Sequence, residues 1–261
     1  MHTHITLNVL ISRIKQCSLV YNYCSSVKDS TKNTWHMGWT PWEHFHSLFG
    51  YEGDESYELD TRVRQFYTKA YNRISGKLMV ENPGPDELSM NGAYPYKFTN
   101  YKEAGHSGAE WLIEQPAYRL SDVYLYLAEA IVRQKGVTSE AIELVNSIRS
   151  RAGLGTDIKK HHTPYYVARW GSDPTASKDA FLHLILWERG RELMGEGQRY
   201  EDLKRFTSPD GTNMLVERAY EQKRISDKAA NAYRVLAPLP HKVVLQSHGI
   251  VVQNPGYPTT E

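Results

Sequence analysis

Apolar residues recur every three or four positions in the second half of the chain, a pattern typical of helices that bury one face. From Tyr118 onward, the residues that share one helical face are Leu120, Val123, Tyr124, Leu127 and Ile131. Gly136 stands where a glycine commonly closes a helix. The pattern predicts a helix that begins near Tyr118, ends at Gly136 and turns this face to the core.

A second helix is predicted directly afterwards. Thr138 supplies an N-cap hydroxyl, Glu140 places an acid in the first turn, and Gly153 ends the helix. Its inner face consists of Ala141, Leu144, Val145, Ile148 and Ala152. Two antiparallel helices of this kind resemble one tetratricopeptide-type hairpin. Because a stable array needs about three such units, we expect further units to accompany it.

A third helix is predicted from Lys178 to Met194, apolar over so wide an arc that most of its sides must be buried. Gly195 and Gly197 end it. The acidic residues of 52–60 and the Gly/Pro-rich segment 81–108 predict loops, and the chain past residue 233 predicts an extended tail. The expected fold is mainly α, with tetratricopeptide-like helical hairpins, long irregular loops and a few short strands.

Composition narrows the class of protein. The formal net charge is +1 without a dominant basic run, which argues against a nucleic-acid partner. Mean hydropathy is −0.58, and no stretch approaches the roughly 20 apolar residues of a membrane helix. Two cysteines, Cys17 and Cys24, exclude a disulfide scaffold by number, and the sequence leaves open whether they pair.

The aromatic residues are unusual, with 18 Tyr and 6 Trp against 6 Phe. Rings with a polar group suit half-exposed surfaces and interfaces. An equally plain explanation is a tyrosine-rich core. The sequence alone does not choose between these two explanations.

The segment from residue 188 to residue 205 raises the question of catalysis. Glu188 and Glu192 are spaced like paired carboxylates, which glycoside hydrolysis uses. Both, however, continue the apolar stripe of their helix, and buried charges must be paired. Nearby arginines, among them Arg149 and Arg151, favour a structural carboxylate–guanidinium network. Its expected members are Glu188, Arg189, Arg191, Glu192, Glu196, Arg199, Asp202 and Arg205.

Motifs for other chemistry are absent from the sequence. It contains no GxSxG elbow, P-loop, GxGxxG after a strand, or HExxH. The histidine pairs at 2/4, 44/46 and 161/162 have no third ligand at metal-ligand spacing. We therefore expect no catalytic residue, no metal and no cofactor.

Four sequence motifs occur in an order that resembles the SusD/RagB family. Tyr118–Ala130 resembles its R-L-x-[DE]-v-y-L-x-x-A-E-A helix, and Ala141–Leu154 resembles its A-l-x-x-v-N-x-v-R-x-R-A-G helix. Glu188–Arg205 resembles E-R-x-x-E-L-x-x-E-G-x-R-x-x-D-L-x-R, and Gln253–Tyr257 resembles the closing Q-N-P-G-Y. Asp60-x-Arg62 and Tyr96-Lys97-Phe98 extend the likeness upstream.

The resemblance implies a non-catalytic protein that is lipid-anchored at the outer membrane and holds oligosaccharides over a SusC-like TonB-dependent transporter. Family members are typically longer, and Cys17 lacks a small-residue lipobox before it. We therefore interpret the chain as a carboxy-terminal portion, with the lipid anchor confined to the full-length form. The expected organisation is an irregular remnant at 1–34, a SusD/RagB-like domain at 35–257 and a tail at 258–261.

In such a protein, sugar would be held by aromatic rings and polar side chains on loops. The expected ligand-binding residues are Trp39, Trp42, Tyr96, Trp111, Tyr166 and Trp170. The alternative for each is packing on the helical core, since indoles are generally well buried. The helical Tyr124 and Tyr126 are expected in the core. Loop shape sets the sugar specificity, so the sequence does not name the glycan.

Two rival functions stay open at this point. A tetratricopeptide-type scaffold would bind a protein partner and have no affinity for glycans. A carboxylate-based glycosidase would lose activity on Glu188→Gln without losing its fold. The buried position expected for Glu188 predicts a folding defect instead.

Overall fold

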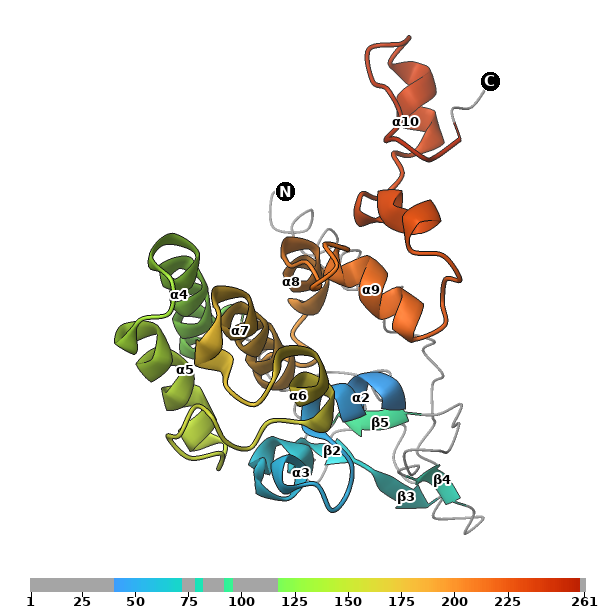
Figure 1. The fold of residues 1–261 in the computed structure, drawn as a ribbon. Coiled ribbons are helices and arrows are strands. Elements are labelled where there is room, and N and C mark those ends of the chain that lie inside the picture. Colours follow the sequence, from blue (N-terminus) through green and yellow to red (C-terminus); the bar gives the residue numbers. More distant parts are fainter. Residues whose placement is uncertain (1–39, 72–77, 82–91, 96–116, 259–261) are drawn as a thin grey trace, which may run out of the picture. The chain divides into compact units, whose positions relative to one another are not determined.

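The computed structural model describes residues 40–71, 78–81, 92–95 and 117–258 (Figure 1). The chain divides into two compact units, residues 1–199 and 200–261. The segment predicted as an irregular remnant, 1–34, lies outside the described residues. The described part is mainly helical with a few short strands, which confirms the predicted fold class.

The elements of the first unit follow one another along the chain as short strands and helices, then longer helices. They are β1 (Thr40–Pro41), α2 (Trp42–Phe49), α3 (Glu55–Leu59), the 3-10 helix η1 (Thr61–Gln65), β2 (Phe66–Tyr67), β3 (Lys69–Tyr71), β4 (Leu78–Glu81), β5 (Gly92–Pro95), α4 (Leu120–Lys135), α5 (Ser139–Arg151), α6 (Pro164–Trp170), the 3-10 helix η2 (Pro174–Ala176) and α7 (Lys178–Glu192).

The strands form two small antiparallel sheets. β5 lies between β1 and β2, with Thr40 opposite Ala93 and Phe66 opposite Pro95. β3 and β4 form a hairpin with an irregularity after Ala70. Parts of the segment predicted as loop are therefore strand, because pairing between distant strands is not visible in local sequence.

Helix α2 was not predicted from the sequence, which favoured a loop at Trp42. Its side chains from His44 to Phe49 are all buried. Phe45 packs against Phe49 and Phe66 with ring centroids 5.0 and 5.2 Å apart. Trp42, Phe45 and Phe49 recur at helical spacing, but a segment of eight residues is too short for this spacing to distinguish a helix from a loop.

Helices α4 and α5 form the predicted hairpin. Gly136 ends α4 at a φ of 80°, where its amide donates to the Val132 carbonyl. The Thr138 hydroxyl accepts a hydrogen bond from the Ala141 amide and caps α5. The boundaries predicted for both helices are confirmed to within two residues.

The predicted inner face of α4 is largely wrong, since only Ile131 of its five residues is buried. Leu125, Ala128 and Val132 are the residues that pack inward, whereas Leu120, Val123 and Leu127 are exposed. Asp122 and Glu129, which do not belong to the predicted face, are buried. The helix carries two apolar faces, and ion pairs to Arg189 and Arg133 let the face with the acids turn inward.

Helix α7 lies at the centre of the first unit, packed on α4, α5, α2 and α6 (Figure 1). Its residues from Ala180 to Glu192 are all buried. This confirms the prediction from its wide apolar arc. The Trp187 indole donates to the Ser47 carbonyl at 2.8 Å and so joins α7 to α2.

Gly153, just past α5, makes a close approach that no other residue allows. Its φ is 92°, and a Cβ placed there would lie 2.5 Å from the Leu59 carbonyl oxygen. We expect Gly153→Ala to lower the free energy of unfolding by about 2 kcal/mol or more, from a strained φ and a backbone clash. Urea denaturation measures this.

Gly155 is the matched control, because its φ is 69° but nothing lies within 4 Å of the position that a Cβ would occupy. Gly155→Ala should cost about 1 kcal/mol, the strain alone. Equal losses for the two variants would contradict the importance of the Leu59 contact.

The second unit contains α9 (Met214–Glu221), the 3-10 helix η3 (Ala229–Val235), α10 (His241–Gln246) and most of α8 (Arg199–Arg205). The extended tail predicted past residue 233 is interrupted by α10. No helix among residues 40–71 and 117–258 is long and apolar enough to cross a bilayer.

The closing Gln253–Tyr257 motif has a clear structural role in this unit. The Gln253 side chain bonds both the amide and the carbonyl of Leu239. The Tyr257 hydroxyl donates to the Leu236 carbonyl, and its ring meets Tyr233 edge to face at 4.8 Å. These contacts fasten the chain end onto the segment that precedes α10.

Candidate functional site

The two acids that suggested catalysis, Glu188 and Glu192, lie one turn apart on α7. Glu188 is 0% exposed and Glu192 is 3% exposed. Their spacing on a helix puts both carboxylates on one side of α7. The groups that surround them therefore decide what they can do.

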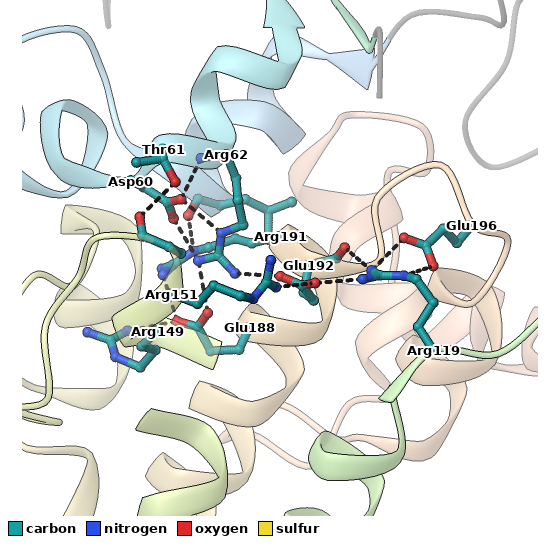
Figure 2. Close-up of polar contacts among 12 residues, drawn as sticks. Asp60, Thr61, Arg62, Arg119, Arg149, Arg151, Glu188, Arg191, Glu192 and Glu196 are labelled. Atoms are coloured by element: carbon teal, nitrogen blue, oxygen red, sulfur yellow. Dashed lines mark hydrogen bonds and ion pairs between the residues drawn. The ribbon is translucent and has the colours of Figure 1, made fainter. Parts of the chain in front are cut away.

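Glu188 is held by three guanidinium groups that come from three elements (Figure 2). Arg149 of α5 donates to Oε1 at 2.7 Å, and Arg191 of α7 donates to the same oxygen at 2.8 Å. Arg62 of η1 donates to Oε2 at 3.0 Å. One buried carboxylate thus joins η1, α5 and α7.

Glu192 is shared among three further ion pairs. Arg151 lies 2.6 Å and Arg119 lies 2.9 Å from Oε1, and Arg62 lies 3.5 Å from Oε2. Arg119 also grips Glu196 with two hydrogen bonds of 2.8 and 2.7 Å (Figure 2). This fork geometry fixes the chain just before α4 to the end of α7.

Asp60 and Arg62 complete the cluster from the other side. Arg62 makes two hydrogen bonds to the Asp60 carboxylate, at 2.8 and 2.7 Å. The Asp60 carboxylate also accepts a hydrogen bond from the Arg62 backbone amide at 3.0 Å and so caps η1. Both side chains are buried, so Asp60 departs from the loop predicted for 52–60. The glutamates of that segment are exposed, and part of it forms α3.

The electrostatics keep both glutamates ionised. Burial by itself would raise the pKa of Glu188, but Arg191, Arg62 and Arg149 hold the pKa well below its ordinary value. Burial likewise opposes ionisation of Glu192, and Arg119, Arg62 and Arg151 lower its pKa. A carboxyl group that acts as a general acid needs a raised pKa, and a glycosidase needs an open site that the substrate can enter. This cluster has neither property.

The structure distributes the expected network members over several contacts. Glu188, Arg191, Glu192 and Glu196 lie in the cluster. Arg189 instead pairs with Asp122 at 2.7 Å and lies 3.8 Å over the Tyr126 ring. Arg199 donates to the Leu186 carbonyl. Asp202 and Arg205 pair with each other at 2.9 Å within the second unit.

Arg149 and Arg151, named from the sequence as nearby arginines, take part in these ion pairs. Four further members were not named there for the network: Asp60, Arg62, Arg119 and Asp122. The sequence signal for Asp60 and Arg62 is the likeness of Asp60-x-Arg62 to the family. The signal for Arg119 and Asp122 is their place in the Tyr118–Ala130 motif. Spacing could not reveal them, because Arg62 lies 126 residues from Glu188 along the chain.

The six expected ligand-binding aromatics differ in their placement. Trp39, Tyr96 and Trp111 lie outside the described residues. Trp42 and Tyr166 are buried, and the Tyr166 hydroxyl donates to the Ala180 carbonyl at 2.7 Å. Their rings pack in the interior of the first unit, so in this conformation neither ring has a free face for sugar.

Trp170 is the remaining candidate, half-buried at the end of α6. Its ring stacks on His183 with centroids 3.7 Å apart. On the same two helices Tyr165 stacks on Trp187 at 5.4 Å, and the exposed Arg169 guanidinium lies 3.6 Å over the Tyr165 ring. Trp170 thus belongs to a row of stacked side chains between α6 and α7.

Among the described residues, no group of three or more His, Cys, Asp or Glu side chains could hold a metal ion. His162, one of the histidines considered above, is half-buried and packs against Tyr166, with ring centroids 4.9 Å apart and planes tilted by 31°. Burial, with Arg149 and Arg191 nearby, lowers its pKa to about 4. His162 is therefore a neutral packing residue at ordinary pH.

Comparisons with known proteins agree with the motifs. SusD-like protein P2 of Formosa agariphila is 29% identical over 172 residues, which are 66% of this chain and 32% of that protein. The chain thus spans about a third of the length of this curated relative.

Two solved structures are similar. B. fragilis NanU matches with a TM-score of 0.55 at 22% identity, over 85% of this chain and 40% of that one. A SusD superfamily protein from Parabacteroides distasonis gives a TM-score of 0.47 at 21% identity, over 77% and 40%. The first of these supports the fold. The SusD family model matches residues 13–257, and the chain therefore belongs to the SusD family.

Proposed function

We propose that this protein binds an oligosaccharide or polysaccharide without transforming it and passes it to an outer-membrane transporter. Proteins of the SusD family are non-catalytic binding proteins, and the family match covers residues 13–257. The proposed partner is a SusC-like TonB-dependent transporter, and the proposed location is the outer-membrane surface, reached through a lipid anchor in the full-length form.

The burial and ion pairing of Glu188 and Glu192 support the proposal that the protein does not hydrolyse its ligand. A glycosidase places two carboxylates on either side of the scissile bond in an open site. Here both acids lie on one side of a helix that is buried all round, and arginines pair with each of them. The cluster stabilises the contact of η1, α5 and α7, and a substrate would have to displace buried ion pairs to reach it.

For glycan contact within the described residues we propose Trp170. An indole ring can stack on the apolar face of a sugar, and the row formed with His183 holds the ring in one orientation. Trp39, Tyr96 and Trp111 stay candidates by type alone. Trp42 and Tyr166 are left out of the proposal because they are buried.

The test is a calorimetric titration of the purified chain against a panel of plant, algal and host glycans. We expect saturable binding of at least one glycan and no reducing ends released. Trp170→Ala should weaken that binding by about tenfold, the loss of one stacking contact worth roughly 1 to 2 kcal/mol.

Tyr118→Ala is the matched control, because Tyr118 is a strongly exposed aromatic residue outside α6 and α7. Its binding should equal that of the unchanged protein. Released sugar products would contradict the proposal, and the absence of any glycan affinity would favour the protein-binding scaffold.

A further inference from the structure

His162 lies beside two guanidinium groups of the cluster around Glu188. Arg149 donates from Nη2 to the Lys160 carbonyl at 2.6 Å, two residues before His162. Arg149 and Arg191 both donate to Glu188 Oε1, at 2.7 and 2.8 Å (Figure 2). The charges of both arginines lower the pKa of His162, so both lie within electrostatic reach of its ring.

The backbone beside His162 is also fixed to α2, close to the point where Arg191 meets that helix. The Thr163 hydroxyl donates to the Ser47 carbonyl at 3.1 Å. Arg191 donates from Nε to the next carbonyl of α2, that of Leu48. Residues on both sides of the histidine are therefore tied to the two arginines or to their immediate neighbours.

Each of the three side chains has a buried polar atom without a hydrogen-bond partner among the described residues. The atoms are Nε of Arg149, Nη2 of Arg191 and Nδ1 of His162. His162 Nε2 lies 2.8 Å from the Ile158 carbonyl, and because a carbonyl only accepts, the neutral ring has its proton on Nε2. Buried polar atoms are normally satisfied by the protein, by water or by an ion, so these three indicate a further group beside them.

The balance of charge determines what kind of group fits. Arg149 and Arg191 are 0% and 2% exposed, and they share a single carboxylate oxygen. Arg62, the third arginine at that carboxylate, has Asp60 as a further partner. Two buried positive charges beside His162 thus meet only part of one negative charge. This excess of positive charge favours an anion.

The protonation state of His162 determines when an anion can bind. The lone pair on Nδ1 of the neutral ring repels an anion. A second proton makes Nδ1 a third donor and adds a third positive charge. The charged or titratable groups that face the ring are Arg149 of α5, Arg191 and Glu188 of α7, and Tyr166 of α6. Since guanidinium groups outnumber carboxylates among them, an anion that enters with the proton stabilises the protonated ring.

We propose that Arg149, Arg191 and protonated His162 bind one halide ion, chloride under ordinary conditions. Hydrogen bonds from charged donors to an anion are about twice as strong as those between neutral groups. His162 is half-buried, so one side of its ring gives the ion a route from solvent. Because the ion binds the protonated ring, the proton and chloride each raise the affinity for the other. The site shares no residue with the proposed glycan contact.

The test is an NMR titration of the His162 ring in the full chain, in sodium chloride and in sodium methanesulfonate at the same ionic strength of about 0.15 M. Methanesulfonate screens charges equally but is larger than chloride. We expect chloride to raise the proton affinity of His162 about tenfold relative to methanesulfonate. The His162→Gln variant identifies the resonance by its loss.

His161 is the matched control, because its Nδ1 lies 3.2 Å from the Glu55 carboxylate rather than beside the two arginines. Its titration should not depend on which salt is present. A crystal soaked in sodium bromide near pH 4, the pKa of His162, should show an anomalous scatterer within hydrogen-bond distance of the three unpartnered atoms. Urea denaturation at the same pH should give a higher midpoint in chloride for the unchanged chain and equal midpoints for His162→Gln.

The outcomes separate the alternatives. Equal proton affinities of His162 in the two salts, or a site without bromide, overturn the proposal. An equal effect of chloride on His161 and His162 would show general screening and overturns it as well. A water molecule that bromide does not replace would assign the three atoms to structural water, which also contradicts the proposal. Glycan binding is not measured here, so failure of this site leaves the proposed function untouched.

Discussion

Glu188→Gln should lower the free energy of unfolding by about 3 to 5 kcal/mol, the usual cost of breaking a buried ion pair by removing one partner. The amide keeps the size of the side chain but loses its charge. Arg62, Arg149 and Arg191 would then lose the carboxylate that all three contact. Urea denaturation followed by circular dichroism measures the loss.

Glu143→Gln is the matched control, since Glu143 is exposed on α5 and its change should alter stability by less than about 0.5 kcal/mol. The same experiment addresses the glycosidase alternative. A Glu188→Gln protein with undiminished stability and a lost hydrolytic activity would place Glu188 in catalysis rather than in packing.

The protein should lose stability in acid in two successive stages. The first stage involves His162, whose folded pKa of about 4 lies below its ordinary 6.5. Between these values the unfolded chain takes up a proton that the folded protein does not. Stability is therefore complete above pH 6.5 and falls as the pH drops toward 4, by about 3 kcal/mol in total.

The second stage involves Glu188 and Glu192, whose folded pKa values are below the ordinary 4.5. Their contribution to stability is fully present above pH 4.5 and is lost progressively below it, because the carboxyl groups of the unfolded chain bind protons at a higher pH than those of the folded protein. The slope of stability against pH should therefore persist below pH 4, where the contribution of His162 has ended.

Urea denaturation at intervals from pH 7.5 to 3.5 resolves the two stages. His162→Gln should flatten the profile between pH 6.5 and 4 and leave the lower part unchanged. Glu188→Gln should reduce the slope only below pH 4.5. A His162→Gln profile that still falls steeply between pH 6.5 and 4 would show that another group causes the first stage.

Local sequence determined those helices that have both a clear apolar period and recognisable residues at their ends. The α4–α5 hairpin has Gly136 and Thr138 at its junction, and the arc of α7 is apolar enough to require burial all round. These signals act within a few residues of one another, so they can be recognised without the fold. The same reasoning placed Glu188 and Glu192 in the interior, because they continue a buried stripe.

Tertiary structure decided the rest, for reasons that local pattern does not contain. Arg62 reaches Glu188 across 126 residues, and only the packing of η1 against α7 brings them together. The choice of which apolar face of α4 turns inward depends on Asp122 finding Arg189, since a buried acid needs its partner. Trp42 belongs to a helix of only eight residues, too short for its apolar spacing to distinguish a helix from a loop, and its burial depends on packing against distant elements such as α6 and α7.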